Sequence, residues 1–140
     1  MFNTVVLALD GSDSSDRALE YATTLAKDQG SAVHVIHVRE IFVGRGGGPV
    51  PLNERDLQTK VELQVEGLTA AGVNADLETH SVPFGGPANV IADAAQSSKA
   101  DVVITGTRGL GGISGLLLGS VAQRLLQLAH CPVLVIPPAA

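Results

Sequence analysis

The chain has 140 residues, of which 45% are hydrophobic, and it carries a net charge of −5 at neutral pH. This length fits one domain with one substantial core, so residues 1–140 are expected to form a single unit. The negative charge, with only 3% aromatic residues and no tryptophan, argues against a nucleic-acid partner, which needs cationic surface and stacking side chains.

The sequence favours a soluble protein of the cytoplasm. Its one cysteine, Cys131, cannot form an internal disulfide. The first apolar run is too short for a signal peptide and has no basic region before it. The longest apolar stretches also fall short of the roughly 20 residues needed to cross a bilayer. We therefore expect no association with a membrane.

Short apolar segments alternate with amphipathic ones, which is typical of strands alternating with helices. The expected elements are a strand over 4–9, a helix that begins at Ser12, Ser14 or Ser15 and ends at Gly30, a strand over 32–38, a helix over 53–72, a strand over 75–81, a helix from Pro87, a strand over 101–105, a helix over 120–129 and a strand over 131–136. This alternation implies an α/β fold, with a parallel sheet covered by helices on both faces. The acids Asp76 and Glu78 favour an edge position for the third strand.

A glycine-rich segment separates the second strand from the second helix. It runs from Ile41 to Pro51 and contains a glycine triplet and two prolines. Such a composition predicts a mobile loop, which could lie over a bound ligand and present the bound state to a protein partner.

A second glycine-rich stretch follows the fourth strand and carries Gly106, Gly109, Gly119 and Ser120. Glycines let backbone N–H groups approach an anion closely, and the helix that begins at Ser120 offers unpaired N–H groups and the positive end of its dipole. No Asp or Glu follows Asp101, so this region has no acid to repel phosphate. Glycines also accumulate in ordinary surface loops, but the order of strand, loop and helix favours a phosphate-binding loop.

Other nucleotide-binding motifs fit the stretch poorly. No Gly-Lys-Ser/Thr follows a glycine at the spacing of a Walker A motif. Gly109 and Gly111 begin a sequence like that of dinucleotide-binding proteins, but Ser114 stands at the last glycine position and no acid follows to bind a ribose.

The spacing of Gly106, Gly109 and the pair Gly119-Ser120 resembles the nucleotide-binding signature of the universal stress protein family, in its ATP-binding branch. The resemblance covers nearly the whole chain. It includes the opening VVLALDGSDSSDRAL, the strand AVHVIHV, the segment SVPFGGPANVIADAA and the closing HCPVLVIP.

This resemblance implies a fold and a site. The fold is an open twisted five-stranded sheet of order 3-2-1-4-5, of the Rossmann-like, adenine nucleotide alpha hydrolase-like kind. The reversal of strand order then falls between the first and fourth strands, where such sheets bind ligands. The residues that match the family's nucleotide contacts are Leu9, Asp10, Gly11, Ser12, Val38, Gly106, Thr107, Arg108, Gly109, Gly119, Ser120 and Val121.

Three of these residues have alternative roles. The family places the acid that matches Asp10 beside adenine and ribose, but Asp10 could also simply begin a turn with Gly11. Val38 matches a main-chain contact to adenine and could equally pack in the core. Arg108 stands where many family members carry histidine, and it could reach a phosphate or remain a solvated loop charge.

The resemblance also implies a function. It implies an ATP-binding stress-response and signalling module with slow hydrolysis or none, no assigned catalytic residue, an unidentified protein partner, and a homodimer formed through the last strand, Cys131 to Ile136. Mg²⁺ could accompany the triphosphate, although no acid pair marks a metal site. The alternatives are a weak ATPase or phosphotransferase, and a dimeric interaction module that binds no nucleotide.

The histidines and the cysteine favour structural roles. His34 and His37 are three residues apart on a strand, so they point to opposite faces and do not share a metal ion. We expect the histidines to be solvated or satisfied within the core. Cys131 is expected to be a buried structural thiol and not a nucleophile.

Overall fold

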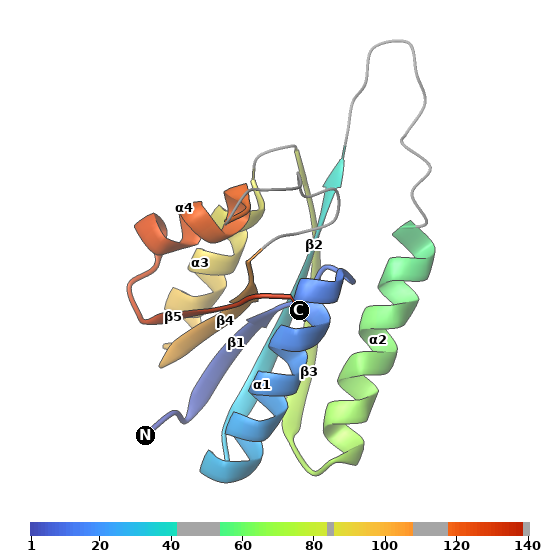
Figure 1. The fold of residues 1–140 in the computed structure, drawn as a ribbon, viewed down its shortest axis with the longest axis vertical. Helices are drawn as coiled ribbons and strands as arrows, with labels where there is room; N and C mark the ends of the chain where they lie inside the picture. The colour runs from blue at the N-terminus through green and yellow to red at the C-terminus, as the bar shows by residue number, and fades with distance from the viewer. Residues whose placement is uncertain (42–53, 84–85, 108–117, 139–140) are drawn as a thin grey trace.

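The computed structural model describes residues 1–41, 54–83, 86–107 and 118–138 (Figure 1). In these residues the elements are the strands β1 (Thr4–Ala8), β2 (Ala32–Ile41), β3 (Asn74–Pro83), β4 (Val102–Gly106) and β5 (Val133–Ile136), and the helices α1 (Asp13–Gln29), α2 (Glu54–Ala70), α3 (Pro87–Ser97) and α4 (Ser120–Leu128). The strands form one parallel sheet of order β3-β2-β1-β4-β5. The predicted fold class and strand order are confirmed.

The sheet is buried on both faces near its centre. Helices α1 and α2 pack on one face, and α3 and α4 pack on the other (Figure 1). In β1, Val5 and Leu7 contact the first layer while Val6 contacts the second, and all three are fully buried. This two-sided burial explains why β1 is apolar at successive positions. Each such side chain contributes about 1.5–3 kcal/mol, so the centre of the sheet dominates the stability of the fold.

Helix α1 has the ends that its sequence predicts. Of the three candidate serines, Ser12 is the N-cap, and its Oγ accepts a hydrogen bond from the Ser15 N–H. Gly30 ends the helix with φ +68°, a conformation that favours glycine. Ala18, Ala22 and Ala26 face the sheet and are buried, so α1 lies close to the strands beneath it.

The boundaries of three strands differ clearly from the predictions. Strands β2 and β3 are longer than predicted because they pair along their full length, from Ala32↔Asn74 to Ile41↔Pro83. Strand β5 begins at Val133 and not at Cys131. Proline lacks the N–H that a further ladder bond would need, and Pro132 contributes only its carbonyl, which accepts from Val103 at 2.9 Å.

Some predictions concern residues outside the described ranges. These include the loop from Ile41 to Pro51, apart from Ile41 itself, and the residues Arg108 and Gly109. Their expected roles stay predictions. Within the described part of the chain, no helix combines the length and the apolar character that crossing a membrane requires.

Asp101 joins the beginnings of β1 and β4. Its Oδ2 accepts hydrogen bonds from the N–H groups of Thr4 at 3.0 Å and Asn3 at 2.8 Å. Its own N–H donates to the Thr4 carbonyl at 2.8 Å. The hydrogen bonds from Thr4 and then Asn3 hold the pKa of the Asp101 carboxyl below its ordinary value of 3.8. The ionised carboxylate therefore stabilises the folded state.

We predict that Asp101→Asn lowers the thermal unfolding temperature at pH 7, because the neutral amide is a weaker acceptor. The folded pKa is depressed, so the contribution of Asp101 is complete above pH 3.8 and is lost as the pH falls below that value. Melting curves of both proteins between pH 7 and pH 2.5 measure the difference. The exposed acid Glu20, on α1, provides the control Glu20→Gln. A difference that stays constant down to pH 2.5 would contradict the assignment.

Candidate functional site

The candidate site lies where β1 and β4 end. These strands are parallel neighbours, with Val5 opposite Val102 and Leu7 opposite Ile104. The two strands therefore end at the same edge of the sheet, where the loop into α1 begins (Figure 1). This is the point at which the strand order reverses, as predicted.

The loop after β1 is held by hydrogen bonds to its own side chains. Asp10 Oδ1 accepts from the Ser12 N–H at 2.9 Å, and the Asp10 N–H donates to Ser15 Oγ at 3.1 Å. Gly11 has φ +86°, which a residue with a side chain adopts only with strain. Asp10 thus begins the turn, in agreement with its alternative role, and the bond from the Ser12 N–H fixes its carboxylate at the end of β1.

Gly106 lies directly against the first turn of α1. A Cβ placed on Gly106 would lie 2.7 Å from Ser14 Cβ and 2.8 Å from the Ser14 carbonyl carbon. Such distances are shorter than van der Waals contact, so any side chain here would push α1 away from β4. Glycine at this position is therefore needed for packing, in addition to any contact with a ligand.

Thr107 joins three parts of the fold. Its Oγ1 lies 3.2 Å from Ser14 Oγ, and both residues are buried. Its N–H donates to the Ile136 carbonyl at 2.9 Å, and its carbonyl accepts from the Gly119 N–H at 2.5 Å. The end of β4 is thereby connected to α1, to the end of β5 and to the beginning of α4.

Sequence reasoning assigned Ser14 only a possible capping role, and that assignment is wrong, because Ser12 caps the helix. The sequence contains one indication that Ser14 contacts the sheet side of the fold. Ser14, Ala18 and Ala22 are spaced by four residues, so Ser14 continues the stripe of α1 that faces the sheet.

The first turn of α4 faces this region, and among the described residues no side chain caps it. The N-cap is Gly119, which is extended at φ −73° and ψ 166°, and no acid occurs in the first turn. Ser120 is exposed and Val121 is half-buried. Free N–H groups and a helix dipole are the features that bind phosphate at helix N-termini.

The remaining predicted residues are less central. Leu9 is a core residue, and its N–H donates to the Ile36 carbonyl at 3.1 Å. Val38 is half-buried and packs in the core, as one of its two predicted roles required. The paired register of β1 with β2 ends at Ile36, so Val38 lies two residues beyond the last pair. Arg108 and Gly109 lie outside the described residues.

The two histidines of β2 point to opposite faces, as predicted. His37 is buried, and its Nδ1 donates to the Leu9 carbonyl at 2.8 Å, so it supports the backbone just after β1. His34 lies at the surface, with Nδ1 2.8 Å from Asp76 Oδ1.

Cys131 is half-buried and not fully buried as predicted, because it lies in the bend before β5. Burial, and then the charge of Asp101, raise the pKa of its thiol. The raised pKa disfavours the thiolate, which agrees with the prediction that Cys131 is not a nucleophile.

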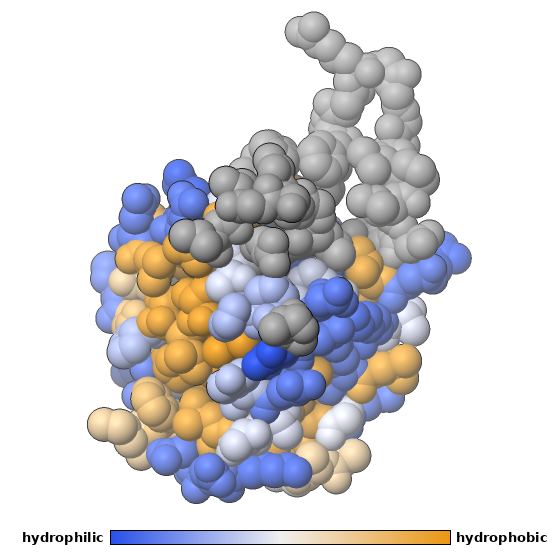
Figure 2. All heavy atoms as spheres, in the orientation of Figure 1, coloured by the Kyte–Doolittle hydropathy of each residue, from blue (hydrophilic) through white to orange (hydrophobic). Residues whose placement is uncertain are grey.

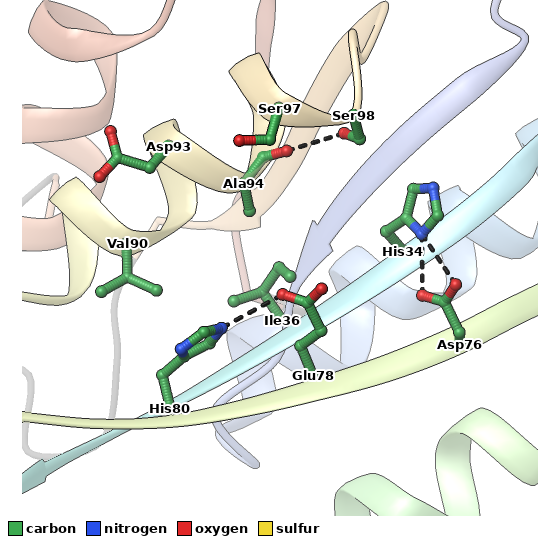
Figure 3. A pocket seen from close by; sticks show the side chains of 10 residues that line it. All are labelled: His34, Ile36, Asp76, Glu78, His80, Val90, Asp93, Ala94, Ser97 and Ser98. Carbon is green, nitrogen blue, oxygen red and sulfur yellow. Dashed lines mark hydrogen bonds and ion pairs between the residues drawn. The ribbon is translucent and has the colours of Figure 1, made fainter.

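A separate groove lies between α3 and strands β2 and β3 (Figure 3). Its volume is about 590 Å³, and its lining includes the acids Asp76, Glu78 and Asp93 and the histidines His34 and His80. His80 Nε2 lies 3.2 Å from Glu78 Oε2. Three carboxylates would repel a nucleotide, so the groove is not a second candidate for the phosphate site. Among the residues described, no three acid, histidine or cysteine side chains are grouped to hold a metal ion.

The chain is similar to known proteins over nearly its whole length. A universal stress protein of Thermus aquaticus, from the QAH/OAS sulfhydrylase 3′ region, is 36% identical over 138 residues, which cover 97% of this chain and 99% of the relative. Universal stress protein YxiE of Bacillus subtilis is 34% identical over 148 residues, with 97% and 99% covered. A solved structure of the universal stress protein from Archaeoglobus fulgidus in complex with dAMP superposes with a TM-score of 0.67 at 25% identity, covering 97% of this chain and 98% of that one.

The model of the universal stress protein family matches residues 1–137. The match extends from β1 through β5 and contains every residue of the candidate site. This chain belongs to the universal stress protein family.

Proposed function

We propose that the crevice between β1 and β4 binds an adenine nucleotide, with ATP as the expected ligand. The protein would act as a nucleotide-dependent module in stress response and signalling. One observation carries this proposal. Through Thr107, the end of β4 contacts Ser14 of α1 and Gly119 at the beginning of α4, so the first turn of α1 and the N-terminus of α4 lie close together at the ends of β1 and β4.

The charges of the crevice give the ligand an orientation. The first turn of α1 contains Asp13 and Asp16, which oppose the binding of phosphate there. The first turn of α4 contains no acid. We therefore place the phosphates at Gly119 to Val121, with Gly106 and Thr107 beside them, and the nucleoside near Asp10.

Asp10 is suited to a ribose. Because its Oδ1 is held by the Ser12 N–H, the carboxylate is fixed and its other oxygen can accept from a sugar hydroxyl. Adenine would then lie toward the backbone of Val38, beyond the last paired residue of β1. The relative from Archaeoglobus fulgidus, crystallised with dAMP, supports an adenine ligand for this fold.

We expect ATP hydrolysis to be slow or absent. Efficient phosphoryl transfer needs a group that positions the attacking water and cations that stabilise the leaving phosphate. The chain has no Walker lysine, and no acid follows Asp101 in its sequence. Mg²⁺ would be held mainly through the phosphate oxygens, since the described residues contain no grouped set of ligands for it.

We also propose a homodimer formed through the last strand, Cys131 to Ile136. Strand β5 is an edge of the sheet, and Leu134 on it is 41% exposed. Leu126 on α4 is 52% exposed, and Figure 2 shows apolar side chains gathered on the side where α4 and β5 lie. An edge strand with apolar side chains favours pairing with another chain. This surface would also serve the alternative function of a dimeric module that binds no nucleotide.

We predict that Ser120→Asp strongly weakens nucleotide binding without unfolding the protein. A carboxylate at the first residue of α4 favours the helix dipole but repels phosphate, so affinity for ATP should fall about 100-fold or more. Gln127→Asp places the same charge in the last turn of the same helix and should leave affinity nearly unchanged. Calorimetric titration of ATP into both variants measures this. Equal ATP affinities for wild type and Ser120→Asp would contradict the placement of the phosphates at the start of α4. If none of the three proteins binds ATP, the alternative of a module that binds no nucleotide is favoured.

We predict that Leu134→Lys converts the dimer to a monomer, because it places a charge in an apolar pairing surface. Leu63→Lys is the matched control, since Leu63 lies on α2 and is 60% exposed. Sedimentation velocity at several protein concentrations gives the oligomeric state. A monomeric wild type, or a dimer that survives Leu134→Lys, would refute the β5 interface.

A further inference from the structure

Helix α2 contacts the loop after β1 through a lysine. Lys60 Nζ donates to the Gly11 carbonyl at 2.7 Å and to Asp16 Oδ2 at 3.0 Å. The other oxygen of Asp16 accepts from Gln64 Nε2 at 2.9 Å. One cation of α2 therefore binds both the loop of the candidate site and the first turn of α1.

The same face of α2 covers Gly11. A Cβ on Gly11 would lie 2.6 Å from Leu57 Cδ2, so the leucine side chain rests on this glycine. Leu57, Lys60 and Gln64 are spaced by three and four residues, which places them on one face of the helix. The first half of α2 thus packs directly on the loop that carries Asp10.

The contact reaches Asp10 through a single peptide unit. The carbonyl that Lys60 binds belongs to Gly11, and the N–H of the same peptide belongs to Ser12, which donates to Asp10 Oδ1 at 2.9 Å. A trans peptide is planar, and its C=O and N–H point in opposite directions. When Lys60 holds the carbonyl toward α2, the N–H is held toward the Asp10 carboxylate.

We propose that Lys60 is a positioning residue that orients Asp10 for the nucleoside and couples α2 to occupancy of the crevice. The inference rests on the proposed adenine-nucleotide function. Lys60 itself does not touch the ligand, and it acts through the Gly11–Ser12 peptide. Because a bound ribose would fix Asp10, it would also fix that peptide, and the Lys60 contact and the start of α2 would become more rigid in turn.

The ion pair between Lys60 and Asp16 does not by itself explain why residue 60 is a lysine. The Lys60 and Asp16 side chains are 39% and 38% exposed, and a pair so accessible to water and salt adds little to stability. The hydrogen bond to the Gly11 carbonyl is charge-assisted and acts on a defined backbone orientation. We therefore expect loss of Lys60 to affect affinity more than folding.

The first test compares ATP affinities by calorimetry. Lys60→Met keeps the aliphatic length and removes the donor, and it should weaken ATP binding about tenfold. Lys60→Arg retains a cationic donor and should recover most of the affinity. Lys27→Met, at an exposed lysine in the last turn of α1, should bind like wild type.

The second test asks whether Lys60 acts through Asp10. In an Asp10→Ala background, where ATP binding should be weaker but measurable through its phosphates, Lys60→Met should have almost no further effect. If Lys60 had only a general structural role, the fold losses of ATP affinity caused by the two substitutions would multiply. Hydrogen exchange supplies an independent readout: ATP should slow exchange in residues 54–64 of wild type and not of Lys60→Met.

The outcomes separate the two proposals. If wild type binds ATP and Lys60→Met binds it equally well, or if the two losses multiply, the positioning role is wrong and the proposed function stands. If wild type binds no adenine nucleotide, both are wrong. The role of Lys60 is supported if Lys60→Met lowers ATP affinity tenfold and Lys60→Arg does not. It also requires that Lys60→Met causes no further loss of affinity in the Asp10→Ala background.

Discussion

The close approach of Gly106 to the first turn of α1 is the constraint on which the rest of the site depends. Backbone atoms of Ser14 occupy the space that a side chain at position 106 would need. This approach allows the hydroxyls of Ser14 and Thr107 to meet inside the protein. Thr107 in turn contacts the carbonyl of Ile136 and the N–H of Gly119. A side chain at position 106 would push α1 away from β4 and disrupt these contacts at the ends of β1 and β4.

Charge is distributed unevenly around this constraint. The α1 side of the crevice carries Asp10, Asp13 and Asp16, while the first turn of α4 carries no acid. A nucleotide has a neutral end and an anionic end, so this distribution favours one orientation. The carboxylate of Asp16 also accepts hydrogen bonds from Lys60 and Gln64 of α2. Two of these acids therefore have different roles: Asp10 is the proposed contact for the nucleoside, and Asp16 connects α1 to α2.

Much of the fold could be predicted from sequence because it depends on local patterns. The apolar runs of β1 and β4, the cap at Ser12 and the stop at Gly30 each follow from residues near them in the chain. The strand order came from the family resemblance and not from the patterns. The lengths of β2 and β3 were underestimated because they depend on pairing between two strands that are distant in sequence.

The site could be predicted only in part for the same reason. The glycines and the serine proposed for it come from the spacing of the family signature, but their neighbours in the fold could not be predicted. Ser14 reads as a cap from sequence, and only the packing of α1 on β4 shows that it contacts Thr107. Lys60 reads as a surface lysine beside an apolar stripe, and its partner carbonyl at Gly11 is 49 residues away. Contacts of this kind need the register of the whole fold.

The most direct test of the account is to map ATP onto the protein by NMR. In ¹⁵N-labelled protein titrated with ATP, we expect saturable shifts in the amides of Asp10 to Ser12, Gly106 and Thr107, and Gly119 to Val121. The amides around the acidic groove of His34, Asp76 and Glu78 should stay unchanged. Shifts confined to that groove, or no saturable shift at millimolar ATP, would contradict the central claim that the crevice between β1 and β4 is a nucleotide site.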